Sequence, residues 1–123
     1  MPDITIRAAQ PSAKFGATFS AYLARPQAAQ APAPRPALVL IQEIFGVNRV
    51  MRDLADGFAA SGYLVACPDL FWRQEPGIQI TDRSEAEWAR AFALYKGFDA
   101  ALGLADLIAT LAHVRSIEGA SGK

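Results

Sequence analysis

A continuous apolar run at residues 37–42 (ALVLIQ) constrains the fold of this chain more than any other feature. Strands that are buried on both faces, as in parallel sheets, have such runs instead of an alternation of polar and apolar residues. Asn48 is a plausible N-cap for a helix that ends near Gly62, and a second apolar run, YLVAC, follows at residues 63–67. Residues 37–67 are therefore predicted to form a strand–helix–strand unit of the kind that builds parallel sheets.

Two further strands are predicted before this unit, at residues 3–8 and 14–24. The second places an apolar residue at every other position, which is typical of a half-buried strand. We expect the two strands to form an antiparallel pair. Residues 26–36 hold four prolines and no large apolar residue, so they are predicted to form a surface loop.

Helical spacing dominates the C-terminal part of the chain. After a long aromatic-bearing loop at residues 68–83, a helix is predicted to begin at Glu85, and a second helix is predicted from about 98 to 117. The expected buried stripe of that second helix consists of Leu104, Leu107, Ile108, Leu111 and Val114. The residues that share one face of the helix after Asn48 are Val50, Leu54 and Phe58. The predicted fold class is therefore α/β, with a mostly parallel sheet, flanking helices and an N-terminal antiparallel strand pair.

The composition of the 123 residues, 52% of them hydrophobic, fits one small domain or part of a larger one. Twelve basic residues balance twelve acidic ones, so we expect neither nucleic acid nor an anionic membrane surface as a partner. The single cysteine, Cys67, cannot form an internal disulfide, which suits a reducing compartment. No apolar stretch reaches the roughly 18 residues of a membrane span, and the N-terminus lacks a signal-peptide core. We therefore expect a cytoplasmic protein.

Glu43 lies where the apolar strand ends, and its role has two interpretations. In open α/β sheets, ligands bind in the crevice beyond the carboxyl ends of the strands. A mostly buried carboxylate facing that crevice, beside Phe45, would be a useful acid or base, and N–H groups of the loop after it could stabilise an oxyanion. Alternatively, Glu43 is a solvated strand-end residue or a charge favoured by the helix dipole. Spacing alone leaves both interpretations open.

Two motifs at matching spacing, QEIFGVN at residues 42–48 and CPDLFWRQEPG at residues 67–77, carry a resemblance to a known family. The chain resembles the dienelactone hydrolases (carboxymethylenebutenolidases) of the α/β-hydrolase superfamily, from its N-terminal strands to the final SGK. The resemblance implies an α/β-hydrolase fold and hydrolysis of small lactones or esters. It also implies a Cys-His-Asp triad that needs no metal or other cofactor.

The resemblance assigns roles to individual residues. Glu43 matches a glutamate that contacts the family's nucleophilic cysteine and helps to activate it, and the Ile44 N–H matches a donor of the oxyanion hole. The arginine that holds the substrate carboxylate in the family aligns, without gaps, with Trp88, whereas Arg83 and Arg90 are near but not equivalent. An ester other than the carboxylated lactone is therefore an equal expectation. The residues expected to contact the substrate are Phe45, Trp88 and Phe92.

In the family, the nucleophile sits in a Gly-x-Cys-x-Gly elbow that follows the stretch resembling SGK. Neither this motif nor Gly-x-Ser-x-Gly occurs in the 123 residues. Residues 1–123 are therefore expected to be the N-terminal half of a single α/β-hydrolase domain and to be inactive alone. A C-terminal half, in the same or another chain, would supply the nucleophile, the aspartate and the histidine. The alternative is a non-catalytic fragment or a small-molecule binding module.

Other features have both a functional and a structural interpretation. Cys67 ends a buried strand without elbow glycines, so a structural role is favoured. His113, the only histidine, falls in mid-helix among apolar residues, which favours a packing or surface role. GASGK at residues 119–123 lacks the spacing of a phosphate-binding loop and is interpreted as a turn that leads into a further strand. The aromatic residues that either line a pocket or cover the sheet edge are Phe71, Trp72 and Trp88.

Overall fold

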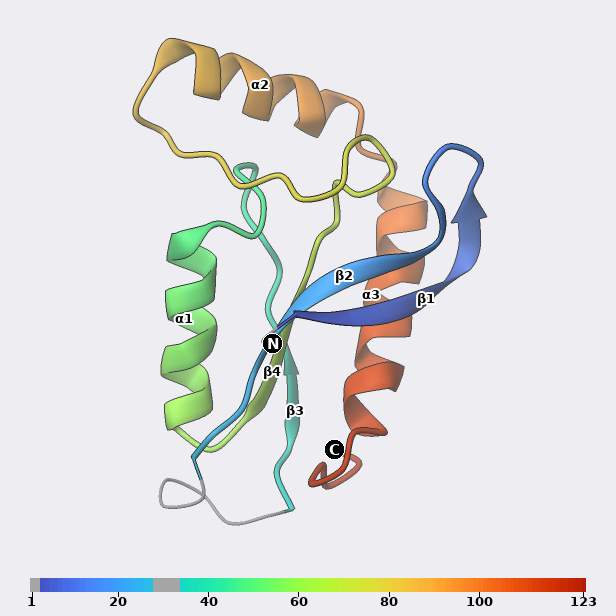
Figure 1. Ribbon diagram of the computed structural model, residues 1–123, viewed down its shortest axis with the longest axis vertical. Helices are drawn as coiled ribbons and strands as arrows, with labels where there is room; N and C mark the ends of the chain where they lie inside the picture. Colours follow the sequence, from blue (N-terminus) through green and yellow to red (C-terminus); the bar gives the residue numbers. More distant parts are fainter. Residues whose placement is uncertain (1–2, 28–33) are drawn as a thin grey trace.

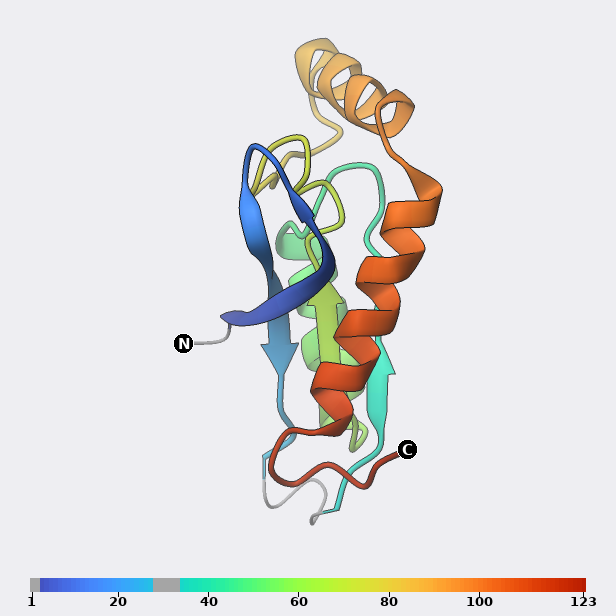
Figure 2. The same cartoon turned by 90° about the vertical axis from the view of Figure 1, so that its right-hand side faces the viewer.

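The structure, a computed structural model, describes residues 3–27 and 34–123 (Figure 1). Its elements are β1 (Asp3–Ser12), β2 (Gly16–Ala24), β3 (Ala37–Val39), α1 (Arg49–Ala60), β4 (Leu64–Pro68), α2 (Glu85–Lys96) and α3 (Ala100–Arg115). The strands form one sheet in the order β1-β2-β4-β3. α1 and α3 lie on opposite faces of this sheet, and α2 lies across the end at which β3 and β4 finish (Figures 1 and 2). The proline-rich loop predicted for residues 26–36 falls largely outside the described residues.

The sheet is mixed, so the prediction of mostly parallel pairing is wrong for the described residues. β3 and β4 are parallel, as predicted for a strand–helix–strand unit, because α1 returns the chain to the end of the sheet where β3 began. β1 and β2 are antiparallel, which confirms the predicted N-terminal pair. β2 also pairs antiparallel with β4 and so joins the hairpin to the parallel unit. β3 is an edge strand of the sheet.

The central strand β4 is buried along its whole length. Leu64 and Ala66 pack against Val114 of α3 on one face of the sheet. Val65 packs against Ala55 of α1 on the other face. This alternation follows the two-residue period of a strand. The second apolar run, at residues 63–67, therefore forms the centre of the molecule, with a helix on either side. The prediction for the first run, a strand over residues 37–42 that is buried on both faces, is wrong in part, because β3 covers only Ala37–Val39 and is half-buried at the edge of the described sheet.

The β1–β2 hairpin extends beyond the parallel strands and packs on α3 (Figures 1 and 2). Ile6 and Phe19 are buried there together with Trp72, whose ring stacks on Phe19 with 5.5 Å between the ring centroids. Of the two interpretations of Trp72, the structure supports neither a pocket wall nor an edge cover. This residue is 1% exposed and belongs to the core beneath the hairpin.

Asn48 caps α1 as predicted, because its side-chain oxygen accepts a hydrogen bond from the Met51 N–H at 3.2 Å. The residues of α1 that are buried against the sheet are Met51, Ala55 and Ala59. The face formed by Val50, Leu54 and Phe58 is exposed. Small alanine side chains let the helix backbone approach the sheet closely, which leaves the larger apolar residues on the outer side.

Both C-terminal helices begin close to their predicted starts, with Ser84 and Asp99 as N-caps. The predicted buried stripe of α3 is wrong in part, because Leu104 is 59% and Ile108 is 62% exposed. The buried residues of α3 are Gly103, Asp106, Thr110 and Val114. A glycine is needed at position 103 because an added Cβ would lie 2.2 Å from the Phe98 ring. The helix thus turns a small and polar face inward, which apolar periodicity does not reveal.

The last residues of the chain run beside the beginning of β3, at the outer edge of the sheet. The turn predicted at Gly119 is present, with a φ of 92°. The Arg35 N–H donates to the Gly119 carbonyl at 2.8 Å, and the Ser121 N–H donates to the Arg35 carbonyl at 2.8 Å. The Ala37 N–H donates to the Lys123 carbonyl at 2.7 Å, and the pairing is parallel. Residues 120–123 therefore point along the direction of β3.

Among residues 3–27 and 34–123, no single helix is long and apolar enough to cross a membrane. α2 and α3 reach that length and hydropathy only together, and they are bent by 90° at the break between them.

Candidate functional site

Gln42 ties together the loops that follow β3 and β4. After β3, the Leu40 N–H still donates to the Ala66 carbonyl at 2.9 Å. The Gln42 side-chain oxygen then accepts from the Leu70 N–H at 2.8 Å, and its Nε2 donates to the Glu43 carbonyl at 2.9 Å. An amide both donates and accepts, so one side chain holds two backbones in register. Sequence analysis gave Gln42 no role, since the partners of an amide cannot be read from its position.

Gly46 makes the turn of the QEIFGVN motif. Its φ is 83°, and a Cβ at this position would lie 2.0 Å from the Ile78 carbonyl oxygen. The Ile80 N–H donates to the Phe45 carbonyl at 3.0 Å, and the Asn48 side-chain amide donates to the Ile80 carbonyl at 2.8 Å. Only glycine combines this φ with so close an approach of two backbones. The motif is therefore a loop fixed against the segment that leads to α2.

Glu43 lies at the wall of an apolar hollow of about 280 Å³ at the carboxyl end of β3. The loops after β3 and β4 and the N-terminal half of α3 form its walls, with apolar side chains from Ile41, Leu70, Phe71, Phe98, Leu104 and Leu107. The Glu43 side chain is exposed, so the prediction that it is mostly buried is wrong. Because β3 is at the edge of the described sheet, its outer side leaves this carboxylate open to solvent.

Ile44 lines the same hollow and is half-buried. Among the described residues, no hydrogen bond uses its N–H. The structure thus brings the Glu43 carboxylate and the Ile44 backbone to one apolar surface. A carboxylate and an available N–H beside an apolar hollow are the groups that acyl-transfer chemistry uses to handle protons and to stabilise an oxyanion.

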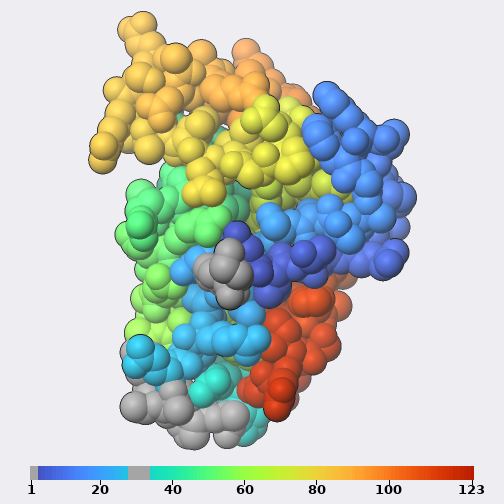
Figure 3. Space-filling view, viewed as in Figure 1, coloured from blue at the N-terminus to red at the C-terminus, as the bar shows by residue number. Residues whose placement is uncertain are grey.

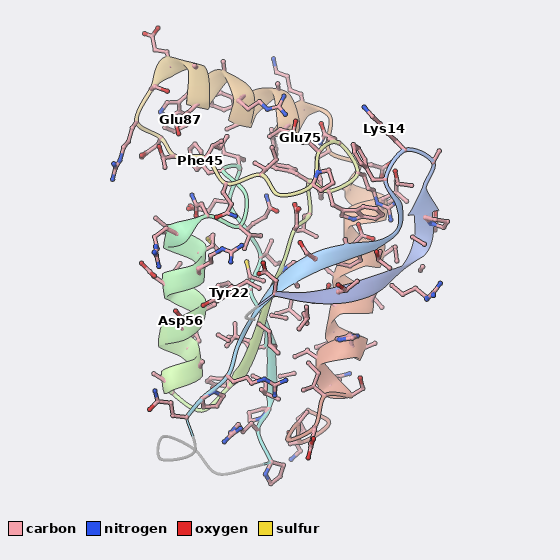
Figure 4. All side chains as sticks on the ribbon, in the orientation of Figure 1. Lys14, Tyr22, Phe45, Asp56, Glu75 and Glu87 are labelled. Carbon is pink, nitrogen blue, oxygen red and sulfur yellow. The ribbon has the colours of Figure 1, made fainter. Side chains whose placement is uncertain are left out.

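Phe45, Trp88 and Phe92, the predicted substrate-contacting residues, form one cluster of rings. Phe45 lies directly below α2 (Figure 4). Its ring meets Trp88 edge-on, with 5.1 Å between centroids and 83° between planes. Trp88 stacks on Phe92 at 5.7 Å, and the Trp88 Nε1 donates to the Asp82 carbonyl at 2.8 Å. The cluster lies next to the hollow rather than within its lining, and Tyr95, a further residue of α2, borders the hollow.

α2 has two buried residues, Ala91 and Leu94, and makes polar contacts with the loops below it. Leu94 packs with Phe71 and Ile78, and the Gln74 side chain donates to the Leu94 carbonyl at 2.8 Å. Arg90 forms an ion pair with Glu75. The space-filling view shows α2 and the loop before it projecting beyond the rest of the molecule (Figure 3). A large part of the helix surface is therefore exposed at the end of the sheet that holds the hollow.

Hydrogen bonds of Glu87 shape the first turn of α2. Its carboxylate accepts from the Thr81 hydroxyl and the Thr81 N–H, both at 2.7 Å, and from the Ser84 hydroxyl at 3.1 Å. The Ser84 hydroxyl in turn accepts from the Glu87 N–H at 3.2 Å. The bonds from Thr81 lower the pKa of Glu87. This reciprocal cap fixes where α2 begins.

A buried ion pair connects the loop after β4 to α3. Asp106 is fully buried and accepts from the Trp72 Nε1 at 2.9 Å. It also accepts two hydrogen bonds from Arg73, at 3.1 and 2.8 Å, and the guanidinium lies over the Trp72 ring. This contact holds the loop that supplies Leu70 and Phe71 to the hollow. Sequence analysis missed it, because the two charges lie 33 residues apart.

Cys67 and His113 lie away from the hollow. Cys67 is fully buried against Val47 and Met51, and burial raises the pKa of its thiol to about 12. A thiol that stays protonated is a poor nucleophile, which supports the structural role expected from the sequence. His113 lies in the last turn of α3, at the end opposite the residues that line the hollow.

Asp69, at the start of the loop after β4, is a second buried carboxyl that the sequence did not single out. One of its oxygens accepts from the Gly77 N–H at 2.8 Å, and the other has no hydrogen-bond partner among residues 3–27 and 34–123. Burial raises the pKa of Asp69, while the bonds from the Gly77 and Phe71 N–H groups oppose the increase. In the part of the chain that the structure describes, no group of three or more His, Cys, Asp or Glu side chains could hold a metal ion.

Comparison with known proteins finds similarity to one family. The family model of the dienelactone hydrolase family matches residues 19–123. A protein of Azospirillum brasilense named "Putative carboxymethylenebutenolidase" is 60% identical over 99 residues, which cover 80% of this chain and 39% of that protein. A carboxymethylenebutenolidase of Pseudomonas putida is 38% identical over 108 residues, which cover 88% of this chain and 44% of that protein.

A solved structure gives the same result at the level of the fold. The crystal structure titled "Putative Dienelactone Hydrolase" from Klebsiella pneumoniae matches with a TM-score of 0.69 and 31% identity. The match covers 98% of this chain and 46% of that one. The chain thus spans less than half the length of these relatives. By sequence and by fold, the chain belongs to the dienelactone hydrolase family.

Proposed function

We propose that this chain is the N-terminal half of a hydrolase domain that cleaves small lactones or esters with a Cys-His-Asp triad. Glu43 contacts and activates the nucleophilic cysteine, and the Ile44 N–H stabilises the oxyanion. The triad residues are supplied by a C-terminal half, in the same or another chain. In this scheme the apolar hollow receives the acyl or ring part of the substrate, while water is the final acceptor of the acyl group.

The observation that carries the proposal is the position of Glu43 and Ile44. Both residues follow the carboxyl end of β3, a parallel strand at the open edge of the described sheet. Residues 120–123 pair with the beginning of β3, in parallel and at this same edge. A strand that continued this pairing would run along β3 toward Glu43, because parallel strands end at the same side of a sheet. A nucleophile at the end of such a strand would meet both groups. Exposure of the carboxylate in the described chain is consistent with a partner on that side.

The proposal is tested by hydrolysis in the complete protein that contains this chain. We expect turnover of a small lactone and of p-nitrophenyl acetate, and a loss of roughly 100-fold in kcat/KM for Glu43→Gln, since positioned acid–base groups contribute about 10²- to 10⁴-fold. The matched control is Glu118→Gln, which changes an exposed glutamate in the turn after α3 and should keep wild-type kcat/KM. Equal activity of the wild type and Glu43→Gln would contradict the role of Glu43.

The alternative is a non-catalytic binding module, and the apolar hollow is the observation that favours it. Binding of small esters by the complete protein without turnover would support this alternative. Hydrolysis that depends on Glu43 would exclude it.

A further inference from the structure

We propose that the half-buried ring of Phe45 and the exposed rings of Trp88, Phe92 and Tyr95, here called the aromatic face, bind an uncharged aromatic part of the substrate. This inference rests on the proposed ester hydrolysis and names its substrate class as neutral aromatic esters. It concerns the surface of α2 beside the hollow, and not the groups that act on the ester carbonyl.

The aromatic face is a continuous and accessible surface. Trp88, Phe92 and Tyr95 are spaced by four and three residues, so they share one face of α2. Their exposed fractions are 39%, 49% and 60%. At 1.5 Å per residue, the face is about 10 Å long, which suits one aromatic ring with a short substituent. Ring contacts between Phe45, Trp88 and Phe92 hold the surface in place before any ligand binds.

The aromatic face joins the candidate site at two points. Tyr95 borders the hollow that Glu43 and Ile44 also line. Phe45 follows Ile44 directly in the chain, and its ring meets Trp88. A ligand whose carbonyl lies near the Ile44 N–H can therefore extend an attached ring onto α2. Offset or edge-on stacking on such rings stabilises a bound aromatic group.

The charges around this face disfavour an anionic ligand. Arg90 is committed to its ion pair with Glu75. Arg83 lies near the Glu87 carboxylate, and its charge contributes to the lowered pKa of Glu87. Lys96 is in the last turn of α2, where the helix carbonyls favour a positive charge. The exposed Glu43 carboxylate adds a negative charge at the inner end of the face. A substrate carboxylate that lies beside the hollow would therefore be repelled by the Glu43 carboxylate.

The first measurement is binding without chemistry, in the complete protein that contains this chain. NMR titrations compare benzamide with benzoate, which have similar size but differ in charge. We expect saturable binding of benzamide with shifts at the Trp88 indole, since its ring stacks on the aromatic face. Its binding should be at least about 10-fold tighter than that of benzoate, because the Glu43 carboxylate repels the anion. Equal or tighter binding of benzoate, or no benzamide shift at Trp88, would overturn the inference.

The second measurement is the ratio of kcat/KM for phenyl acetate to that for 4-carboxyphenyl acetate. Trp88→Phe keeps a ring and should leave the ratio within about 3-fold. Trp88→Arg places a cation on the face and should lower the ratio by about 10- to 100-fold, as expected for a charge-assisted contact. The control Tyr63→Ala removes an exposed ring just before β4, away from α2, and should leave the ratio unchanged.

The two proposals fail in different ways. Absence of hydrolysis of either ester contradicts the proposed function, while the benzamide and benzoate titrations still decide the inference. Hydrolysis that favours the carboxylated ester, or a ratio that Trp88→Arg leaves unchanged, overturns the inference and leaves the proposed function intact.

Discussion

At the scale of single residues, burial decides which polar and reactive groups take part in chemistry. Cys67 is the only cysteine of the chain, and it is fully buried. Glu43 and Trp88, by contrast, are exposed beside the hollow and on α2. A fully buried thiol that stays protonated is a packing group, whereas an exposed carboxylate at a strand end is available to a partner.

We predict that Cys67 reacts with Ellman's reagent about 10³-fold more slowly in the folded chain than in the unfolded chain at pH 8, since the thiolate is the nucleophile. The raised pKa also gives a pH dependence. Between the ordinary value of 9.0 and about 12, the folded state binds more protons than the unfolded state. The free energy of unfolding therefore falls as the pH rises through this range. The variant Cys67→Ala should lack this fall in the free energy of unfolding. Rapid labelling of the folded chain by Ellman's reagent would contradict the prediction.

At the scale of elements, the loops that form the site are held in place by specific contacts of a few single residues. Gly46 lets the QEIFGVN loop touch the Ile78 backbone, and Gln42 links this loop to the one after β4. Asp106 fixes the second loop to α3 through Arg73. Since these contacts join segments distant in sequence, the shape of the hollow depends on a few single residues.

We predict that Gly46→Ala destabilises the complete protein by at least about 2 kcal/mol, from backbone strain at positive φ together with the clash at Ile78. The matched control is Gly57→Ala in α1, where an added Cβ meets nothing within 4 Å. This change should stabilise the protein by about 0.5–1 kcal/mol, because alanine loses less conformational freedom in a helix. Urea denaturation followed by circular dichroism measures both. Equal stability of the two variants would show that the loop tolerates a side chain.

At the scale of the whole molecule, large apolar surfaces flank the outer edge of β3. A groove along this edge is lined by Val39, Ile41, Leu107, Ile108 and Leu111. Leu104 is a further exposed apolar residue of α3, and the outer face of α1 carries Val50, Leu54 and Phe58. Edge strands beside exposed apolar residues recruit other chains.

We predict that residues 1–123 alone associate with themselves or aggregate, and that they do not hydrolyse p-nitrophenyl acetate. Sizing chromatography with light scattering and an esterase assay measure the two properties. The triple variant Ile41→Ser, Leu104→Gln, Ile108→Gln should shift the chain toward the monomer. The control variant Tyr63→Ser, which replaces an exposed aromatic residue away from the groove, should not. A monomer with turnover that depends on Cys67 would contradict both parts of the prediction and would locate the nucleophile at Cys67.

The sequence by itself determined the order of elements and most of their limits. Apolar runs, caps and glycine stops are local signals, so the strand–helix–strand unit, the N-terminal hairpin and the starts of α1 and α2 were predictable. The two motifs and their spacing also indicated the family, which the comparisons confirm. These features depend on neighbouring residues, which a single sequence displays directly.

Only the tertiary structure decided which faces are buried and how the site is held. The apolar spacing predicted that Leu104 and Ile108 lie on the buried face of α3. In the structure another face is buried, the one that carries Asp106 in its ion pair with Arg73. The order of the strands in the sheet decides that β2 pairs antiparallel with β4. The same order places Glu43 beside an edge strand, where it is exposed. Such pairings bring distant segments together, and their energy depends on contacts that no local pattern of residues encodes.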